Sequence, residues 1–456
     1  MDELIIRNVR CFSDPGSARI APITLLVGEN STGKTTFLAL TRLAWDTAFG
    51  SGTPDFNDDP FFLGGYDQIA HFHGGRVGRA RTFEIAFKIE SSQQLREKVP
   101  GELKDHIVFN STFIQRGPQP ILKSKSITCG QYKIVAQFVR LPAQMSIVIT
   151  TPSGSRTLLL PREMPRSFLT REFIDWDDLL FLVWRRTMVP IRRGRGKEIS
   201  RGGRGKEISE KEFAALRRIL QHASLHFPLR PYAIAPIRTK PERTYNPIKD
   251  IPTAEGIHVP MVLAKSYIEN REEWHKLRGI LDRFGESSGL FEDIRIKPLG
   301  KTVSDPFQIR FKIFGPAANL IDVGYGVSQV LPILVDAIRG SDEQMFLLQQ
   351  PEVHLHPRGQ AQLSSFLCLL AKQDKKKFVI ETHSDYMIDR ICMDVRDGNF
   401  GLRPDDVSIL FFNREGSEIV IHNISLDQTG NLVDAPLAYR QFFLEEERRF
   451  FGMEKP

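Results

Sequence analysis

Eight consecutive residues near the N-terminus have the types and spacing of a phosphate-binding loop. Residues 28–35 read GENSTGKT, which fits the pattern G-x-x-x-x-G-K-[ST] at every position. Glycines permit a turn whose backbone N–H groups converge on phosphate oxygens, and a following helix adds its positive N-terminal dipole. Lys34 is expected to reach the β- and γ-phosphates of ATP, and Thr35 to bind Mg²⁺. The predicted nucleotide-binding residues of this loop are Gly28, Glu29, Asn30, Ser31, Thr32, Gly33, Lys34, Thr35 and Thr36.

A second set of motifs lies in the last third of the chain. A loop punctuated by glycine and serine, DVGYGVSQ at 322–329, precedes the apolar run VLPILVDAI. It is followed by MFLLQQPEVHLHP at 345–357 and by KFVIETHS at 377–384. Short apolar runs that end in polar residues are typical of buried parallel strands with functional side chains at their carboxyl ends.

Taken together, these motifs resemble the ABC ATPases, in particular the branch that contains RecF, the SMC proteins and the OLD-family nucleases. The resemblance implies a signature loop that caps the γ-phosphate bound to a partner's P-loop, so that ATP lies between two copies of the chain. It also implies a D-loop region at His354–Pro357 and a switch histidine, His383, that contacts the γ-phosphate. The implied signature residues are Gly324, Gly326, Ser328 and Gln329.

One departure from the ABC pattern concerns catalysis. The positions of the Mg²⁺-orienting acid and of the catalytic glutamate are occupied by Gln349 and Gln350. A carboxamide is nearly isosteric with a carboxylate but cannot accept a proton, so hydrolysis is expected to be slow. Three explanations stay open: engineered glutamines, a naturally slow ATPase, or Glu352, just beyond Pro351, as the catalytic acid.

Further site residues are predicted on weaker patterns. Gln68, after the first helix, is expected to sense Mg²⁺, together with Thr35 and Gln349. Arg10 and Phe12 are expected near the adenine. The alternation in HLHP offers two imidazoles without a third ligand at suitable spacing, so a separate metal site is not expected there.

The elements around these motifs predict an α/β fold. Strand–helix alternation at both ends of the chain indicates a mixed or parallel sheet, and alternating runs from about 83 to 160 indicate an antiparallel β subdomain. The expected organisation is an N-terminal half of the ATPase domain at 1–90, the antiparallel subdomain at 91–162, a mainly helical insertion at 163–289 and the C-terminal half of the ATPase domain at 290–456. The insertion contains RGKEIS twice, at 195–200 and 204–209, which is expected to form a flexible Arg/Gly-rich loop.

Composition places the chain in the cytoplasm. The four cysteines are scattered without a CxxC pair, and no apolar run is long enough for a membrane helix or a secretory signal. The net charge of +7 comes from one segment, 185–218, which carries 12 basic and four acidic residues. This segment is expected to contact DNA, to dock an acidic protein, or to be a solvated loop.

The same branch of ABC ATPases suggests two functions. The segments GYDQIAHF and APIRTKPERTYNP are similar to stand-alone ATPases of prokaryotic anti-phage operons, of the PARIS or Septu kind. That similarity implies a homodimer, or a larger even-numbered oligomer, that senses a phage protein or DNA and controls a separate effector, such as a nuclease. About 70 residues follow His383 in this sequence, so an attached TOPRIM nuclease domain is not expected and a separate effector is implied. The alternative is a DNA-repair or chromosome-maintenance ATPase of the RecF/SMC type that binds DNA directly.

Overall fold

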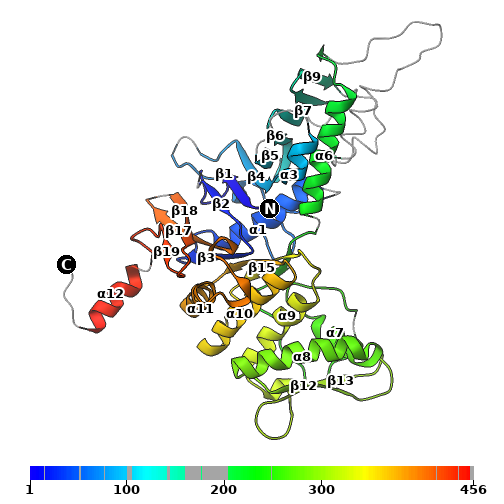
Figure 1. Cartoon of the computed structure of the whole chain (residues 1–456), viewed down its shortest axis with the longest axis vertical. Helices are drawn as coiled ribbons and strands as arrows, with labels where there is room; N and C mark the ends of the chain where they lie inside the picture. Colours follow the sequence, from blue (N-terminus) through cyan, green and yellow to red (C-terminus); the bar gives the residue numbers. More distant parts are fainter. Residues whose placement is uncertain are drawn as a thin grey trace. The chain divides into compact units, whose positions relative to one another are not determined.

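The computed structural model describes residues 1–14, 16–50, 53–75, 78–99, 105–140, 144–159, 176, 204–227, 229–247, 249–416, 418–439 and 441–451. The chain forms two compact units (Figure 1). We call the unit of Met1–Ile20, Ala39–Arg230 and Arg414–Ile421 the antiparallel unit. The unit of Ala21–Leu38, Pro231–Asn413 and His422–Pro456 is the P-loop unit. Helix α1, Lys34–Phe49, contributes its first residues to the P-loop unit and the rest to the antiparallel unit.

The antiparallel unit is built on a nine-stranded sheet in the order β10-β9-β8-β7-β6-β5-β4-β1-β2. Every strand pairs antiparallel with its neighbours, as the sequence predicts for the runs from about 83 to 160, and β1, β2 and β10 join this sheet from outside that range. The strands are β1 Glu3–Arg7, β2 Ser17–Arg19, β4 Thr82–Glu90, β5 His106–Arg116, β6 Gln119–Cys129, β7 Tyr132–Arg140, β8 Gln144–Thr151, β9 Gly154–Leu159 and β10 Arg204–Gly205.

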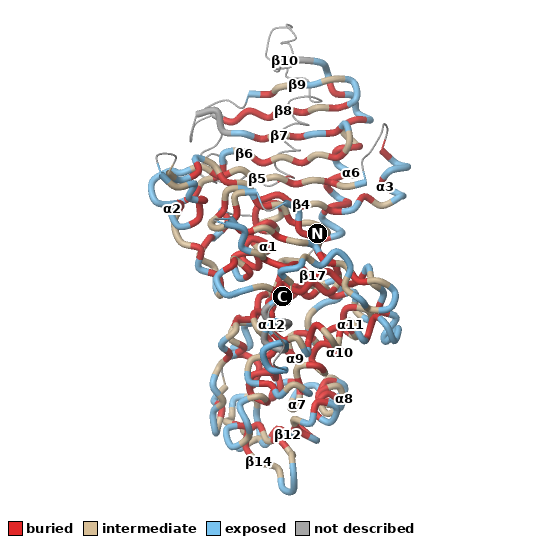
Figure 2. Tube along the Cα trace, turned by 90° about the vertical axis from the view of Figure 1, so that its left-hand side faces the viewer, coloured by how far each residue is buried: buried red, intermediate tan, exposed pale blue. Residues whose placement is uncertain are grey.

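Alternating side chains explain why these residues form strands. In β5 every second residue is buried up to Phe113, because successive side chains of a strand point to opposite faces. Figure 2 shows β4 to β9 side by side, with buried and more exposed residues alternating along them. The helices of this unit are α2 Tyr66–Ile69, α3 Gln93–Lys98 and α6 Glu210–His226.

The repeated RGKEIS segment is only partly described. Its first copy lies outside the described residues. The second copy, 204–209, forms β10 and the N-cap of α6, so this part corrects the expectation of a flexible loop. Ser209 Oγ accepts from the Glu212 N–H, and the Glu212 carboxylate accepts from the Ser209 N–H at 3.0 Å. This capping box satisfies two backbone donors at the start of the helix.

The P-loop unit contains a seven-stranded sheet in the order β11-β15-β16-β3-β17-β18-β19. The strands β11, β15, β16, β3 and β17 are parallel, which confirms the predicted α/β fold with a mixed sheet. The strands are β3 Ile23–Gly28, β11 Tyr232–Ile234, β15 Met345–Gln349, β16 Lys377–Glu381, β17 Val407–Glu415, β18 Glu418–Leu426 and β19 Leu432–Val433. Residues 414–421 of β17 and β18 belong to the antiparallel unit.

Helices and a small second sheet complete the P-loop unit. Helices α7 and α8 lie with β12 and β13 at one end of it (Figure 1). The small sheet consists of β12 Asp293–Pro298, β13 Phe307–Lys312 and β14 Ala318–Asn319. The α-helices are α7 Val259–Glu269, α8 Arg271–Ser288, α9 Tyr325–Arg339, α10 Pro357–Gln373, α11 Asp385–Arg396 and α12 Gln441–Phe450. Short 3₁₀ helices occur at Leu320–Asp322, Asn399–Gly401 and Pro404–Asp406.

The central strands of this unit are buried on both faces. All five residues of β15 are buried, as are Ile23–Val27 of β3. Parallel strands covered by helices on both faces read as continuous apolar runs, which explains MFLL and ITLLV. The carboxyl ends of β15, β16 and β3 therefore lie along one edge of the sheet, where polar side chains follow the apolar runs. No helix in the described part of the chain has the length and apolarity needed to cross a membrane.

Candidate functional site

The predicted phosphate-binding loop joins β3 to α1. Three of its residues have positive φ: Gly28 at 139°, Ser31 at 63° and Gly33 at 94°. A side chain at Gly28 would meet the carbonyl oxygen of Phe412, on the paired strand β17, at 2.5 Å from its Cβ. Only glycine fits where β17 comes this close, so packing explains this residue of the motif.

Lys34 lies over this loop. Its side chain is buried, and its Nζ donates to the carbonyl oxygens of Gly28 and Glu29 at 3.0 and 2.6 Å. Burial lowers the pKa of Lys34, and the nearby carboxylates of Glu381 and Glu29 oppose that shift. The loop thus places a buried cation beside its own backbone, as phosphate binding requires.

Thr35, the residue predicted to bind Mg²⁺, contacts an acid that our sequence analysis did not single out. Its Oγ1 donates to Glu381 Oε2 at 2.8 Å. Glu381 is the last residue of β16 and is buried. Burial raises its pKa, whereas the Thr35 hydroxyl and the Lys34 charge lower it. The signal in the sequence was an acid at the end of the apolar run FVI, two residues before His383.

The two glutamines differ in their surroundings. Gln349 is 6% exposed, and its Nε2 has no hydrogen-bond partner among the described residues. Gln350 is half-buried with a φ of 43°, and its N–H donates to the Glu381 carbonyl oxygen at 2.8 Å. A non-glycine residue with positive φ is strained, and such strain concentrates at functional sites.

Glu352, the alternative catalytic acid, is also buried at this edge. Its Oε1 accepts from the His383 N–H at 2.8 Å, while its Oε2 has no partner in the described part of the chain. Burial raises the pKa of Glu352, and the His383 N–H and the Arg238 charge are among the groups that lower it. A carboxylate with one oxygen anchored and the other unpartnered has the arrangement needed to hold a water molecule.

Arg238, from the segment APIRTKPERTYNP, was not predicted as a site residue. It is 2% exposed, and its Nε and Nη2 have no partner among the described residues. Burial lowers its pKa to about 10, and the charge of Glu352 opposes the shift. A buried arginine without full hydrogen bonding is costly, and its sequence signal was only that the segment resembled related ATPases.

His383 lies just beyond β16 and reaches solvent. Partial burial lowers its pKa, and the nearby Lys34 charge lowers it further. The structure thus brings the predicted switch histidine to the P-loop, in the same unit. Its imidazole is therefore more often neutral near pH 7 than a free histidine.

The predicted signature residues divide into exposed and buried ones. Gly324, the N-cap of α9, is exposed, and Gly326 is close to the His354 carbonyl oxygen, which would lie 2.8 Å from an added Cβ. Ser328 is buried, and its hydroxyl donates to the Tyr325 carbonyl oxygen at 2.9 Å. Gln329 is buried as well, and its Oε1 accepts from the Arg238 N–H at 3.3 Å.

Three further predicted residues, Gln68, Arg10 and Phe12, belong to the antiparallel unit, whereas the predicted D-loop region at His354–Pro357 lies in the P-loop unit. Gln68 Oε1 accepts from the Gly65 N–H at 3.0 Å, at the start of α2. Arg10 donates to the Leu63 carbonyl oxygen at 2.9 Å. Phe12 is fully buried, which argues against its prediction as an adenine contact because a stacking ring must be accessible. In the described residues no group of three or more His, Cys, Asp and Glu side chains could hold a metal ion.

One family model matches this chain. Residues 267–388 match the AAA ATPase domain. The matched segment contains the predicted signature loop and both strands β15 and β16. None of the curated protein sequences matches the chain significantly.

Several solved structures are similar at low identity. The SMC head domain from Thermotoga maritima has a TM-score of 0.38 at 9% identity, covering 92% of this chain and 98% of that one. An Smc head domain with a coiled coil and joint from Pyrococcus yayanosii has a TM-score of 0.41 at 9% identity, covering 98% and 99%. At this degree of similarity, the candidate site is assigned from the residues of this chain alone. The match over 267–388 and the P-loop at 28–35 together support the prediction of an ATP-binding protein of the P-loop ATPase kind.

Proposed function

We propose that this chain is an ABC-type ATPase that binds Mg²⁺-ATP and dimerises around it. The observation that carries the proposal is the meeting of Lys34, Thr35, Glu381, Glu352 and His383 at one edge of the parallel sheet. Lys34 and the backbone N–H groups of the loop bind the phosphates. His383 contacts the γ-phosphate and so distinguishes ATP from a nucleotide without it.

The residues present fit a magnesium ion. Mg²⁺ prefers oxygen ligands and keeps several waters, and the site offers the Thr35 hydroxyl as a ligand, with the Glu381 carboxylate accepting the hydrogen bond of that hydroxyl. The unpartnered Nε2 of Gln349 and Oε2 of Glu352 provide a buried donor and acceptor for water. Bound to the nucleotide, Mg²⁺ neutralises charge on the β- and γ-phosphates.

Hydrolysis in this site is slow, because Gln350 cannot accept a proton from water. Glu352 is the carboxylate available to do so, although its backbone anchor at His383 fixes one of its oxygens. Nucleotide binding therefore acts mainly as a switch between separate and joined copies.

Two features of the signature loop support the dimer. Gly324 and Tyr325 are exposed at the N-terminus of α9, a helix of 15 residues whose first N–H groups suit an anion. Tyr325 is 51% exposed, a large side chain available to a partner. Each chain thus presents its signature loop to the ATP of its partner.

Analytical ultracentrifugation tests the assembly. The protein is expected to be dimeric, or an even multiple, with saturating ATP and Mg²⁺, and Lys34→Ala to lose the ATP-dependent part of that assembly. A monomer under saturating ATP and Mg²⁺ would contradict the composite site.

In this proposal the ATP-bound dimer is a sensor and scaffold that controls a separate effector, such as a nuclease, in anti-phage defence. The similarity of APIRTKPERTYNP and GYDQIAHF to stand-alone defence ATPases supports this step. Co-expression with the product of the adjacent gene tests it by size-exclusion chromatography. A complex that forms with this chain and dissociates in Lys34→Ala supports the scaffold; a nuclease neighbour that never binds contradicts it.

Direct DNA binding is the second candidate, and exposed cations favour it. Lys206, Lys211 and Arg217 are exposed on or just before α6, and Arg218 is exposed while donating to the Lys98 carbonyl oxygen at 2.6 Å. Such a surface makes sequence-independent phosphate contacts that weaken with salt. Filter binding over a salt series tests direct DNA binding. If the protein has no affinity for duplex DNA at low salt, this function is excluded.

A further inference from the structure

The carboxyl ends of β15 and β16 carry a glutamine and a glutamate as direct neighbours. Gln349 and Glu381 are register partners at the last position of their strands. β16 lies between β15 and the P-loop strand β3. An acid at position 381 is therefore closer to the P-loop strand than an acid at position 349 would be. The difference is the spacing between neighbouring strands, about 4.8 Å.

We propose that Glu381 is the carboxylate of the magnesium shell, and that β16 supplies the acid that β15 lacks. This inference rests on the proposed Mg²⁺-ATP site and names the residue that completes it. Its role is to orient the metal's ligands and water.

The contacts of the Glu381 side chain support this role. Its Oε2 accepts from the Oγ1 of Thr35, the P-loop hydroxyl expected to bind Mg²⁺, at 2.8 Å. The Lys34 charge lies close enough to stabilise the carboxylate. A carboxylate that accepts a hydrogen bond from a metal-ligating hydroxyl fixes the orientation of that ligand, as outer-shell carboxylates do in metal sites.

The backbone of Glu381 is held from both neighbouring strands. Its carbonyl oxygen accepts from the Gln350 N–H at 2.8 Å, and the next residue, Thr382, donates to the Leu26 carbonyl oxygen at 3.2 Å. Because β15 and β3 both fix this position, the carboxylate is placed before any ligand binds. Preorganisation of this kind is what a metal-orienting group needs.

Glu381→Gln is the variant that separates metal binding from folding. Glutamine keeps an oxygen that can accept the Thr35 hydrogen bond but removes the charge. The matched control is Asp394→Asn, another buried acid of the P-loop unit, which accepts from the Ser365 hydroxyl at 2.7 Å and the Asn399 amide at 2.9 Å. Thermal melting of both variants reports on the fold.

The measurement is Mn²⁺ binding to the protein–ATP complex by EPR of free Mn²⁺, beside ATP affinity by calorimetry in EDTA. Glu381→Gln is expected to lower Mn²⁺ affinity about 10- to 100-fold and to leave ATP affinity in EDTA unchanged. Asp394→Asn should bind Mn²⁺ as the wild type does. Wild-type Mn²⁺ affinity in Glu381→Gln, or equal losses in both variants, would overturn the inference.

The swap Gln349→Glu/Glu381→Gln moves the carboxylate to β15 without changing composition. Recovery of Mn²⁺ affinity would support the inference that an acid at the end of either strand serves the same metal. An affinity as low as that of Glu381→Gln would overturn the inference that the two strand ends serve one metal. If the wild type binds no ATP in either condition, the proposed function itself fails, which is a different outcome.

Discussion

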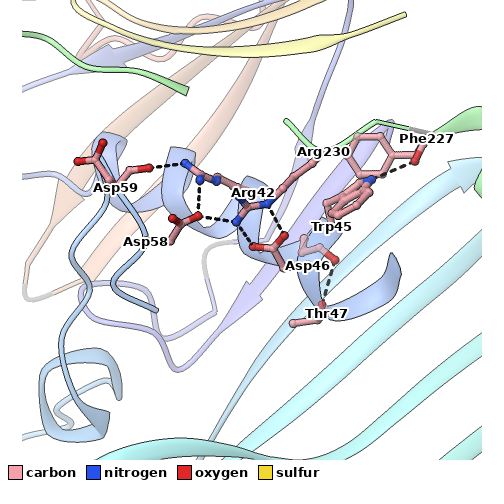
Figure 3. Close-up of polar contacts among 9 residues, drawn as sticks. Arg42, Trp45, Asp46, Thr47, Asp58, Asp59, Phe227 and Arg230 are labelled. Carbon is pink, nitrogen blue, oxygen red and sulfur yellow. Dashed lines mark hydrogen bonds and ion pairs between the residues drawn. The ribbon is translucent and has the colours of Figure 1, made fainter. Parts of the chain in front are cut away.

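Two clusters of polar side chains, one in each unit, meet their hydrogen-bonding needs in different ways. In the antiparallel unit, Arg42, Asp46, Asp58 and Arg230 form a network (Figure 3). Arg230 binds both oxygens of Asp46, at 2.6 and 2.7 Å, and also contacts Asp58 at 2.5 Å. Arg42 donates to Asp58 and to the carbonyl oxygen of Asp59, which leaves only its Nε without a partner in the described residues.

The cluster at the end of β15 in the P-loop unit is less complete. Arg238, Gln349 and Glu352 are each less than a tenth exposed, and each has at least one polar atom without a partner in the described structure. Unsatisfied buried polar atoms are rare in folded proteins because each costs about 1–3 kcal/mol.

This difference between the clusters indicates where a ligand is expected to bind. Two arginines and two aspartates balance each other in the first cluster, so it stabilises the fold by itself. The second cluster retains unused donors and acceptors, which is the arrangement of a site built for bound water, metal and phosphate. Loss of a charged partner should accordingly destabilise the protein in the first cluster, whereas in the second cluster it should weaken ligand binding, and replacing an unsatisfied polar group there by an apolar one should stabilise the ligand-free protein.

Lys34→Ala gives the largest expected effect and tests the phosphate-binding loop of the P-loop unit. Removing the buried ammonium leaves the phosphates without their point charge, so ATP binding should be abolished. The fold should persist, because among the described residues Lys34 donates only to two carbonyl oxygens of its own loop, those of Gly28 and Glu29. Calorimetry measures the affinity, and circular dichroism controls for folding. Unchanged affinity would contradict the P-loop assignment.

Gln350→Glu should raise the rate of hydrolysis, since a carboxylate polarises the attacking water. General-base assistance is worth about 10²- to 10⁴-fold, or roughly 3–5 kcal/mol. Gln349→Glu should have a smaller effect on the rate and act chiefly through Mg²⁺ affinity. Steady-state phosphate release measures both. If neither raises the rate and Glu352→Gln abolishes it, Glu352 is the catalytic acid.

Asp46→Asn should destabilise the protein without changing ATP affinity. An amide cannot balance the charge of Arg230, whose hydrogen bonds with Asp46 raise the pKa of the guanidinium. Asp46 is 11% exposed but Arg230 is 39% exposed, so solvent screening reduces the loss to about 2–3 kcal/mol. Chemical denaturation measures it, with Asp342→Asn at an exposed position as the control. Equal free energies of unfolding for Asp46→Asn and the wild type would contradict the stabilising role of the first cluster.

Gln349→Leu gives the smallest expected effect, with the opposite sign. Its buried Nε2 has no partner in the part of the chain that the structure describes, so an apolar side chain of similar size should stabilise the nucleotide-free protein by about 1 kcal/mol. The melting temperature without nucleotide is the readout. A clear loss of stability would show that the Gln349 amide already has a hydrogen-bond partner in the folded protein. The cluster would then have no unused donor for a ligand at this position.

Local motifs predicted much of this site. The P-loop could be found because one short segment carries both its glycines and its charged residues. Phe378–Ile380 and Leu347–Leu348 could be recognised as buried parallel strands because both of their faces are apolar. Arg238 was missed because nothing in its local sequence distinguishes a buried arginine from the many exposed ones.

The α/β class, the phosphate-binding loop and the two glutamines that follow the apolar run of β15 can all be read from the amino-acid sequence alone. The contact between Glu381 and Thr35 becomes visible only in the folded chain, because the two residues are separated by 346 positions. Such a contact depends on strand order, because β16 must lie between β15 and β3 for the acid to meet the P-loop. Hydrophobic periodicity predicts that a strand exists and which residues it buries, but it carries no information about the neighbouring strand.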